Sequence, residues 1–318
     1  MHSVCLFLLL MGTTLFSAPT EESPGGWESA LKALTLGDRQ ALEAFFRAAL
    51  KDALGGYVLY GEKPVCVENI NAHQHHGLGS NYLPFDHFHK SQIYFKKGYE
   101  VWKGLPLESK KYLIHLSDDT LFGGYDLIFV NKKSVKEEFF KSSALFRYVM
   151  GPATTAESIL DAFETKGESL YPLTNDNRVL IGILLGYGVE NALMQSRHEY
   201  IFDSLWDHEQ IYPLQSSHLK SILSRKNKKD ASLYAQRVHG PSFSFSTILD
   251  ENTWLRAGNQ LSLARAPSDK LAFPWFGYWE GTESEGILNS YSKTQKKLAA
   301  VLNSDHFLEE IFDQLFSE

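Results

Sequence analysis

The chain has 318 residues, of which 43% are apolar and 22% are charged. This composition supplies ample material for a packed core and excludes an intrinsically disordered protein. The formal net charge is −7 at pH 7. General binding to nucleic acid or to anionic membranes needs a basic face, so we expect no nucleic-acid partner.

The N-terminal segment differs in composition from the rest of the chain. Residues 4–16 carry no charge, and Ser17-Ala18 precede a polar stretch. Such a run is too short for an ordinary membrane span and is typical of a secretory signal. Two features leave a retained N-terminal anchor open as the alternative. No Lys or Arg precedes the run, and Phe16 stands where a small residue is expected.

The predicted division of the chain follows from this composition. We expect a signal peptide over 1–18, a linker over 19–26 and a single globular α+β domain over 27–318, with the option of a subdivision near residue 151. The protein is then exported, to a periplasm or out of the cell. Its mature chain is expected to contain no integral membrane span.

The N-terminal half of the chain predicts β-hairpins mixed with helices. A helix capped by Asp38 carries Leu42, Phe45 and Leu50 on one side and ends at Gly55-Gly56. The other elements that we expect before residue 164 are strands at 57–60 and 65–67 joined as a hairpin, a second strand pair at 112–116 and 126–130, and helices at 91–102, at 134–150 and from Thr154 or Thr155 to Phe163.

The half that follows Gly151 is mainly helical. We expect a short strand at 242–248 and helices at 282–302 and 304–316, the last one capped by Ser304. The aromatic run 273–279 is expected in the core or in a packed loop, with sugar stacking or a membrane surface as alternatives. The predicted fold class is α+β, with hairpins and helices in the N-terminal half and a mainly helical C-terminal half around a buried central helix.

That central helix is the apolar run at 174–198. Thr174 to Asn177 offer caps for its first turn, and apolar residues recur at steps of three and four. Interior glycines cost roughly 1 kcal/mol each, so Gly182, Gly186 and Gly188 together cost about 3 kcal/mol. Burial of four or five large apolar side chains, at roughly 1.5 to 3 kcal/mol each, outweighs this cost.

The same run also permits a strand followed by a nucleotide-binding turn. Residues 179–185 form an unbroken apolar run, and the sequence GYGVEN at 186–191 begins like the fingerprint GxGxxG, with Asp203 as a downstream acidic residue. The third glycine is replaced by Asn191, where close helix packing needs Gly or Ala. We prefer the helix, which predicts no cofactor, and keep the nucleotide turn as the alternative.

Histidines are concentrated between residues 73 and 89. Zinc or copper binds neutral imidazoles in sets of three or four, so the composition permits a zinc site. The segment is rich in Gly, Asn and Pro and contains no HExxH pattern, so it lacks a rigid frame for ligands. We expect adventitious binding here, with a selected zinc site as the alternative. The candidate ligands are His73, His75, His76, Asp86, His87 and His89.

Other signs of catalysis are scarce in the sequence. Cys66 lies between Val65 and Val67, which predicts a small buried side chain and not a nucleophile. The sequence contains no GxSxG, P-loop or EF-hand pattern. Carboxylates pair only in three dimensions, so a glycosidase arrangement stays open.

Three short motifs carry a resemblance to a known group of proteins. They are YGEKPV at 60–65, LLGYGVENA at 184–192, and Pro274-x-Phe276 followed by Glu283-Ser284 and Tyr291. Together they resemble a pattern in uncharacterised, often exported proteins of chlamydia-type intracellular bacteria. The resemblance implies export and a helical central run, and it implies no catalytic residue.

Two classes of function follow from these observations. In the first, the protein is exported and non-catalytic, and it binds another protein or the cell envelope. In the second, it is a metal-dependent or other hydrolase whose polar residues converge only in the folded chain. The lack of catalytic motifs favours the first class.

Overall fold

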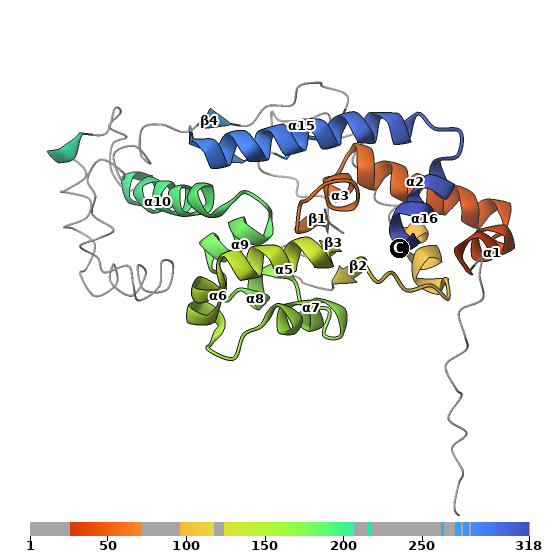
Figure 1. Ribbon diagram of the computed structural model, residues 1–318, viewed down its shortest axis with the longest axis horizontal. Coiled ribbons are helices and arrows are strands. Elements are labelled where there is room, and N and C mark those ends of the chain that lie inside the picture. Colours follow the sequence, from red (N-terminus) through yellow and green to blue (C-terminus); the bar gives the residue numbers. More distant parts are fainter. Residues whose placement is uncertain are drawn as a thin grey trace, which may run out of the picture.

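The structure is a computed structural model that describes residues 26–71, 96–117, 124–206, 215–217, 262–263, 271–274, 276–279 and 281–317. The predicted signal peptide 1–18, the histidine segment 73–89 and the predicted strand 242–248 lie outside these residues. The fold is α+β, as the sequence predicted: a small antiparallel sheet comes from the N-terminal half, and the described C-terminal half is mainly helical (Figure 1).

The sheet consists of β1 (Val65–Asn71), β2 (Tyr112–Ser117) and β3 (Gly124–Asn131), in the order β1-β3-β2. Both pairings are antiparallel, with Val65 opposite Val130 and Tyr112 opposite Asn131. Strands at 65–67, 112–116 and 126–130 were therefore correctly predicted. Two residue pairs form a separate short antiparallel ladder between β4 (Ser262–Leu263) and β5 (Gly277–Tyr278).

Two hydrophobic cores lie on the two faces of the three-stranded sheet. Leu127 and Phe129 of β3 belong to the first core, and Ile128 and Val130 belong to the second. This division follows from the alternation of side chains along a strand. The central strand β3 thus connects the two halves of the hydrophobic interior.

Helices from both ends of the described chain cover the first core. They are α1 (Gly26–Ala33), α2 (Leu36–Lys51), α3 (Gly55–Leu59), α15 (Thr282–Leu302) and α16 (Phe307–Phe316). A further helix is described over 96–104, which overlaps the predicted helix 91–102, and it contributes Tyr99 and Trp102. Aromatic rings dominate the contact between the N-terminal and C-terminal helices, as in the edge-to-face pair of Phe46 and Phe312 at 6.3 Å.

Helices from the middle of the chain cover the second core. They are α5 (Lys132–Lys141), α6 (Ser143–Met150), α7 (Ala156–Glu164), α8 (Leu170–Leu173) and α9 (Arg178–Leu184). The long α10 (Val189–Trp206) follows α9 and starts near the N-terminal end of α15, from which it runs away to the left in Figure 1. None of the helices in the described ranges combines the length and apolar content that a membrane span needs.

The first long helix begins earlier than Asp38 and ends before Gly55. Thr35 is its N-cap, and the Thr35 hydroxyl oxygen accepts the N–H of Asp38 at 3.1 Å while donating its proton to the Asp38 carboxylate at 2.7 Å. Asp38 is therefore a first-turn partner of the cap and not the cap itself. The helix ends at Lys51, so the predicted end at Gly55-Gly56 was wrong.

The predicted strand 57–60, and with it the hairpin to 65–67, was wrong. Gly55–Leu59 is the short helix α3, whose residues are all buried between α2, α15 and the sheet. A short apolar run has the composition of either a strand or a buried helix. Here close packing explains the helix, because a Cβ on Gly55 would lie 3.0 Å from the ring of Phe129, and one on Gly56 would lie 2.7 Å from Leu298.

The predicted helix 134–150 is interrupted at Ser142, which ends α5 and precedes α6. Of the two predicted starts of the next helix, Thr154 and Thr155, the second is correct: Thr155 and Ser158 form a reciprocal capping box. At the C-terminus α15 has the predicted bounds, but α16 begins at Phe307 and its N-cap His306 makes no side-chain cap bond. Ser304 lies before this helix and accepts the N–H of His306.

The predicted central helix 174–198 consists of two helices and a turn. Asn177 caps α9 by accepting the N–H of Leu180 at 3.0 Å, and α9 is buried from Val179 to Leu184. The helix ends at Leu184, with Leu185 as its C-cap, and α10 begins at Val189. The alternative of a strand at 179–185 was wrong, because these residues form intrahelical hydrogen bonds.

Candidate binding pocket at the glycine turn

Residues 185–188, which we call the glycine turn, separate α9 from α10. Gly186 has a φ of +77° and Gly188 a φ of +81°, a conformation that side-chain-bearing residues rarely adopt. Space is also short at both positions. A Cβ on Gly186 would lie 2.8 Å from the Tyr291 hydroxyl, and one on Gly188 would lie 2.6 Å from the Glu283 carboxyl carbon. Both glycines are therefore required by conformation and by packing.

The carboxylate of Glu283 occupies the start of α10. Its Oε1 accepts the N–H of Val189 at 3.0 Å, and its Oε2 accepts the N–H of Glu190 at 2.8 Å. The first amides of a helix have no intrahelical partner and attract anions. In this chain an internal carboxylate, 94 residues away from Val189 in sequence, satisfies two of them.

Asn191 joins the glycine turn to two further segments. Its Nδ2 donates to the carbonyl of Tyr187 at 2.9 Å, and its Oδ1 accepts the N–H of Trp279 at 3.2 Å and the hydroxyl of Ser284 at 2.9 Å. The side chain is 1% exposed. The residue that stands where a dinucleotide fingerprint has its third glycine is thus the centre of a buried hydrogen-bond network.

Two side chains bind the carbonyl groups at the end of α9. The hydroxyl of Tyr291 donates to the carbonyl of Gly186 at 2.7 Å, and Nζ of Lys63 donates to the carbonyl of Leu185. Lys63 is 1% exposed, and its Nζ lies 4.6 Å from the centroid of the Tyr187 ring. Burial lowers the pKa of Lys63 to about 8, although the nearby Cys66 and Glu68 raise it in part.

The buried Cys66 and the half-buried Glu68 form a pair on β1, close in sequence to Lys63. The thiol of Cys66 donates to Oε1 of Glu68 at 3.4 Å, and the N–H of Leu54 donates to the same oxygen at 2.9 Å. Burial raises the pKa of both the thiol and the carboxyl group. Cys66 is 1% exposed, which confirms the predicted buried side chain, and a raised pKa disfavours the reactive thiolate.

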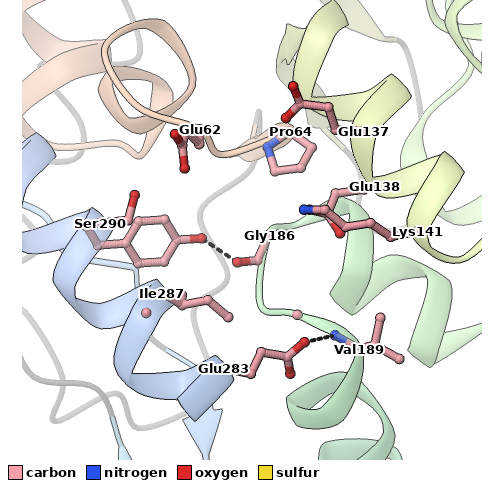
Figure 2. A pocket seen from close by; sticks show the side chains of 13 residues that line it. Glu62, Pro64, Glu137, Glu138, Lys141, Gly186, Val189, Glu283, Ile287 and Ser290 are labelled. Atoms are coloured by element: carbon pink, nitrogen blue, oxygen red, sulfur yellow. Dashed lines mark hydrogen bonds and ion pairs between the residues drawn. The ribbon is translucent and has the colours of Figure 1, made fainter.

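A cavity of about 220 Å³, which we call the junction pocket, opens at the glycine turn. Four chain segments meet around it: the connection from α3 to β1, helix α5, the glycine turn with the start of α10, and the first half of α15 (Figure 2). Its lining consists of Glu62, Pro64, Glu137, Glu138, Lys141, Gly186, Gly188, Val189, Glu283, Gly286, Ile287, Ser290 and Tyr291.

The charged groups of the junction pocket are four glutamates and one lysine. Nζ of Lys141 lies 2.6 Å from Oε1 of Glu138, and Glu137 pairs with Lys133 at 3.7 Å. The hydrogen bond that Lys141 donates to Glu138 raises the pKa of Lys141, and the charges of Glu137 and Glu62 add to this effect. Acidic side chains therefore dominate the electrostatic field at the pocket.

The residues predicted as metal ligands are not in this site. His73, His75, His76, Asp86, His87 and His89 fall in a segment that the structure does not describe. In the part of the chain that is described, no group of three or more His, Cys, Asp or Glu side chains is arranged to hold a metal ion.

The segments that carry the resemblance noted above do lie together here. Lys63, Tyr291 and Glu283 bind the glycine turn, and the rings of Tyr187 and Phe276 stack at 4.8 Å. Phe276 and Trp279 are buried, as predicted for the aromatic run in a core or packed loop.

The charged lining of the pocket was not predicted. Glu62, Glu137 and Lys141 stand in ordinary polar surroundings in the sequence, and only the fold brings them together. The motif GYGVEN does contribute one wall of the pocket, but as a turn between two helices and not as the nucleotide-binding turn that it suggested.

No protein-family model, no curated protein and no solved structure matches this chain.

Proposed function

We propose that the protein is an exported, non-catalytic binding protein, and that the junction pocket is where it holds a partner protein or a component of the cell envelope. Export is supported by the composition of residues 1–18. The binding role is supported by the pocket itself, which is a concave site lined by polar and apolar groups that converge from four segments.

The observation that carries this proposal is the separation of the pocket from the buried reactive groups. Catalytic groups with strongly shifted pKa values normally face a cleft. Within the described chain Lys63 and Cys66 are not part of the pocket lining, and Lys63 is directed to the carbonyl of Leu185. Tyr291 does line the pocket, but its hydroxyl proton is donated to Gly186. This arrangement favours binding over catalysis.

An exposed aromatic residue beside the pocket supports a protein partner. Phe140 of α5 is 69% exposed and stands three residues after Glu137 on the same helix. Residues three apart are neighbours on a helix surface. Exposed aromatic rings at the edge of a polar pocket are common in recognition surfaces.

Site-directed crosslinking tests the proposal. A photoreactive maleimide is attached to a Ser290→Cys variant, at the pocket, or to an Asp305→Cys control at an exposed site before α16. Both are exposed to light in extracts and envelopes of the cells that make the protein. We expect one product of defined mass with Ser290→Cys and none with the control. Identical products from both positions, or no product from Ser290→Cys, would contradict a partner at the pocket.

A search for turnover makes the same test sharper. The purified protein is incubated with chromogenic ester, phosphate, peptide and glycoside substrates. We expect no turnover above the level of a Glu138→Gln variant. Turnover that this substitution abolishes would assign the pocket to catalysis and overturn the proposal.

A metal-dependent hydrolase is the second candidate, and the histidine-rich sequence between residues 73 and 89 favours it. Metal analysis of protein purified without a histidine tag distinguishes the two functions. Zinc in a one-to-one ratio that disappears in a His87→Ala/His89→Ala variant would favour the hydrolase. Substoichiometric metal that dialysis removes would favour the binding protein.

A further inference from the structure

We propose that the junction pocket accepts the side chain of an arginine from a basic segment of a partner protein. This inference rests on the proposed binding function and specifies the chemistry of the bound group. Three observations support it: the shape of the cavity, the chemistry of its walls, and the fact that the anion-binding amides at the start of α10 are already bound by a carboxylate of the same chain.

The pocket does not offer the amides that an anion would need. The first N–H groups of a helix such as α10 are the natural site for a phosphate or a carboxylate. Glu283 already binds the N–H groups of Val189 and Glu190 with both of its oxygens. A second anion would meet the negative charge of Glu283 instead of the helix terminus, so the pocket selects against anions.

The remaining walls suit a long side chain with a cationic end. Pro64, Ile287 and Tyr291 provide apolar surface for an aliphatic stem. Glu62 and Glu138 lie on different sides of the cavity, as Figure 2 shows. A planar guanidinium has donors along two edges and can bridge carboxylates from two directions, whereas an ammonium is a point charge.

The cations already present leave negative charge at the pocket. Lys141 is held by Glu138, and Lys133 is paired with Glu137. No ion pair to Glu62 occurs between residues of the described chain, and Glu62 is exposed at the pocket. The whole chain has a net charge of −7, which attracts a basic segment from a distance. A volume of about 220 Å³ is large enough for one such side chain.

A titration followed by nitrogen–proton NMR tests this proposal on the full chain. The probes are N-acetyl-arginine methylamide and the same derivative of citrulline, which has nearly the same shape without the charge. We expect the arginine derivative to shift the amide signals of Gly186, Gly188 and Ser290, and the citrulline derivative to leave them unchanged. Equal shifts with both probes, no shift with either, or the same shifts with inorganic phosphate would each overturn the proposal.

Three variants place the probe at the pocket. Glu62→Gln/Glu138→Gln should weaken binding about tenfold, or about 1.4 kcal/mol. Gly286→Leu should abolish binding by filling the cavity. The variant should still fold, because a Cβ at this exposed helical position meets nothing within 4 Å and glycine is a poor helix former. Asn289→Leu puts the same side chain on α15 outside the lining and should bind like the wild type. Unchanged binding in Gly286→Leu would also overturn the proposal.

The crosslinking experiment separates this inference from the proposed function. A partner that crosslinks at Ser290 through a segment without arginine would overturn the inference and leave the binding function in place. The absence of both a crosslinked partner and an arginine-dependent shift would contradict both.

Discussion

The carboxylate of Glu283 lies on the first amides of α10, where its Oε1 accepts the N–H of Val189 at 3.0 Å. This bond joins the start of α15 to the start of α10 across 94 residues of sequence. It also occupies the position at which a nucleotide phosphate would bind if GYGVEN were a dinucleotide fingerprint. In this fold the motif instead allows the starts of α10 and α15 to lie close together.

Removing this carboxylate should weaken the fold. We expect Glu283→Ala to lower the free energy of unfolding by about 1–2 kcal/mol, as for the loss of a helix cap with its charge. Glu283→Gln should lose less, because one oxygen can still accept an amide proton. The measurement is urea denaturation followed by circular dichroism. Glu285→Ala is the matched control, because Glu285 is exposed in the same helical turn and should change stability by less than about 0.5 kcal/mol. Equal effects of Glu283→Ala and Glu285→Ala would refute this role.

Any side chain at Gly188 should destabilise the protein. We expect Gly188→Ala to cost at least about 2 kcal/mol, because a left-handed residue with a Cβ costs roughly 1–2 kcal/mol and the new methyl group would also press on Glu283. Gly286→Ala, in the open face of α15, should instead stabilise the protein by about 0.5–1 kcal/mol. Thermal unfolding of both variants checks the contrast. A neutral Gly188→Ala would show that the turn has a different conformation.

The sequence predicted the parts of this fold that have local signals. Strands β2 and β3 were placed correctly because apolar residues bounded by Gly and Asp are a local pattern. The helix α3 was mistaken for a strand, because only its burial between α2 and the sheet distinguishes the two. The glycine turn was placed inside a helix because the contacts that require its positive φ come from Glu283 and Tyr291, about a hundred residues away.

The candidate site was even less accessible from the sequence. GYGVEN was singled out and Glu283 stood in a separate motif, but nothing in the sequence indicated that the Glu283 carboxylate binds the amides that follow the glycines. Glu62, Glu137 and Lys141 line the pocket because the fold brings α5 and the α3–β1 connection to the same cavity. Spacing along one chain does not reveal such a convergence.

His115 should make the protein sensitive to acid. Both ring nitrogens of this residue on β2 are buried without a hydrogen-bond partner in the described structure, and the ring packs 6.3 Å from that of Phe163. Burial lowers the pKa of His115 from 6.5 to about 4. On acidification the unfolded chain therefore takes up this proton first, and stability falls as the pH drops from 6.5 to 4, by about 3 kcal/mol at most.

The matched comparison is His115→Leu against His306→Gln, since His306 is exposed. Urea denaturation at several pH values should show the loss below pH 6.5 in the wild type and in His306→Gln, and a smaller loss in His115→Leu. Parallel stability curves for all three proteins would show that His115 is not the group responsible.

Lys63 should make stability depend on pH in the alkaline range. Its pKa is about 8 in the folded state and near 10.5 in the unfolded chain, so the folded state releases this proton first as the pH rises. Below pH 8 the full cost of burying the charge is present. Between pH 8 and 10.5 the wild type should gain up to about 3 kcal/mol relative to Lys63→Met.

The difference between the two proteins is the quantity to measure, by urea denaturation between pH 7 and 10. Tyr57 and Tyr187, whose pKa values are raised by burial, occur in both proteins and cancel in this difference. A difference that stays constant over this range would mean that Lys63 is not buried as a cation at neutral pH.

The central claim is that the helix terminus at the glycine turn is occupied by the chain's own carboxylate, which leaves the junction pocket to a cationic partner. Amide hydrogen exchange of Val189 and Glu190, measured by NMR with and without NAD, ATP or phosphate, tests it most directly. We predict that both amides are protected in the wild type, that Glu283→Ala removes this protection, and that none of the three anions shifts their signals. Signals of Val189 and Glu190 that move on addition of a nucleotide, or protection that survives in Glu283→Ala, would contradict the account.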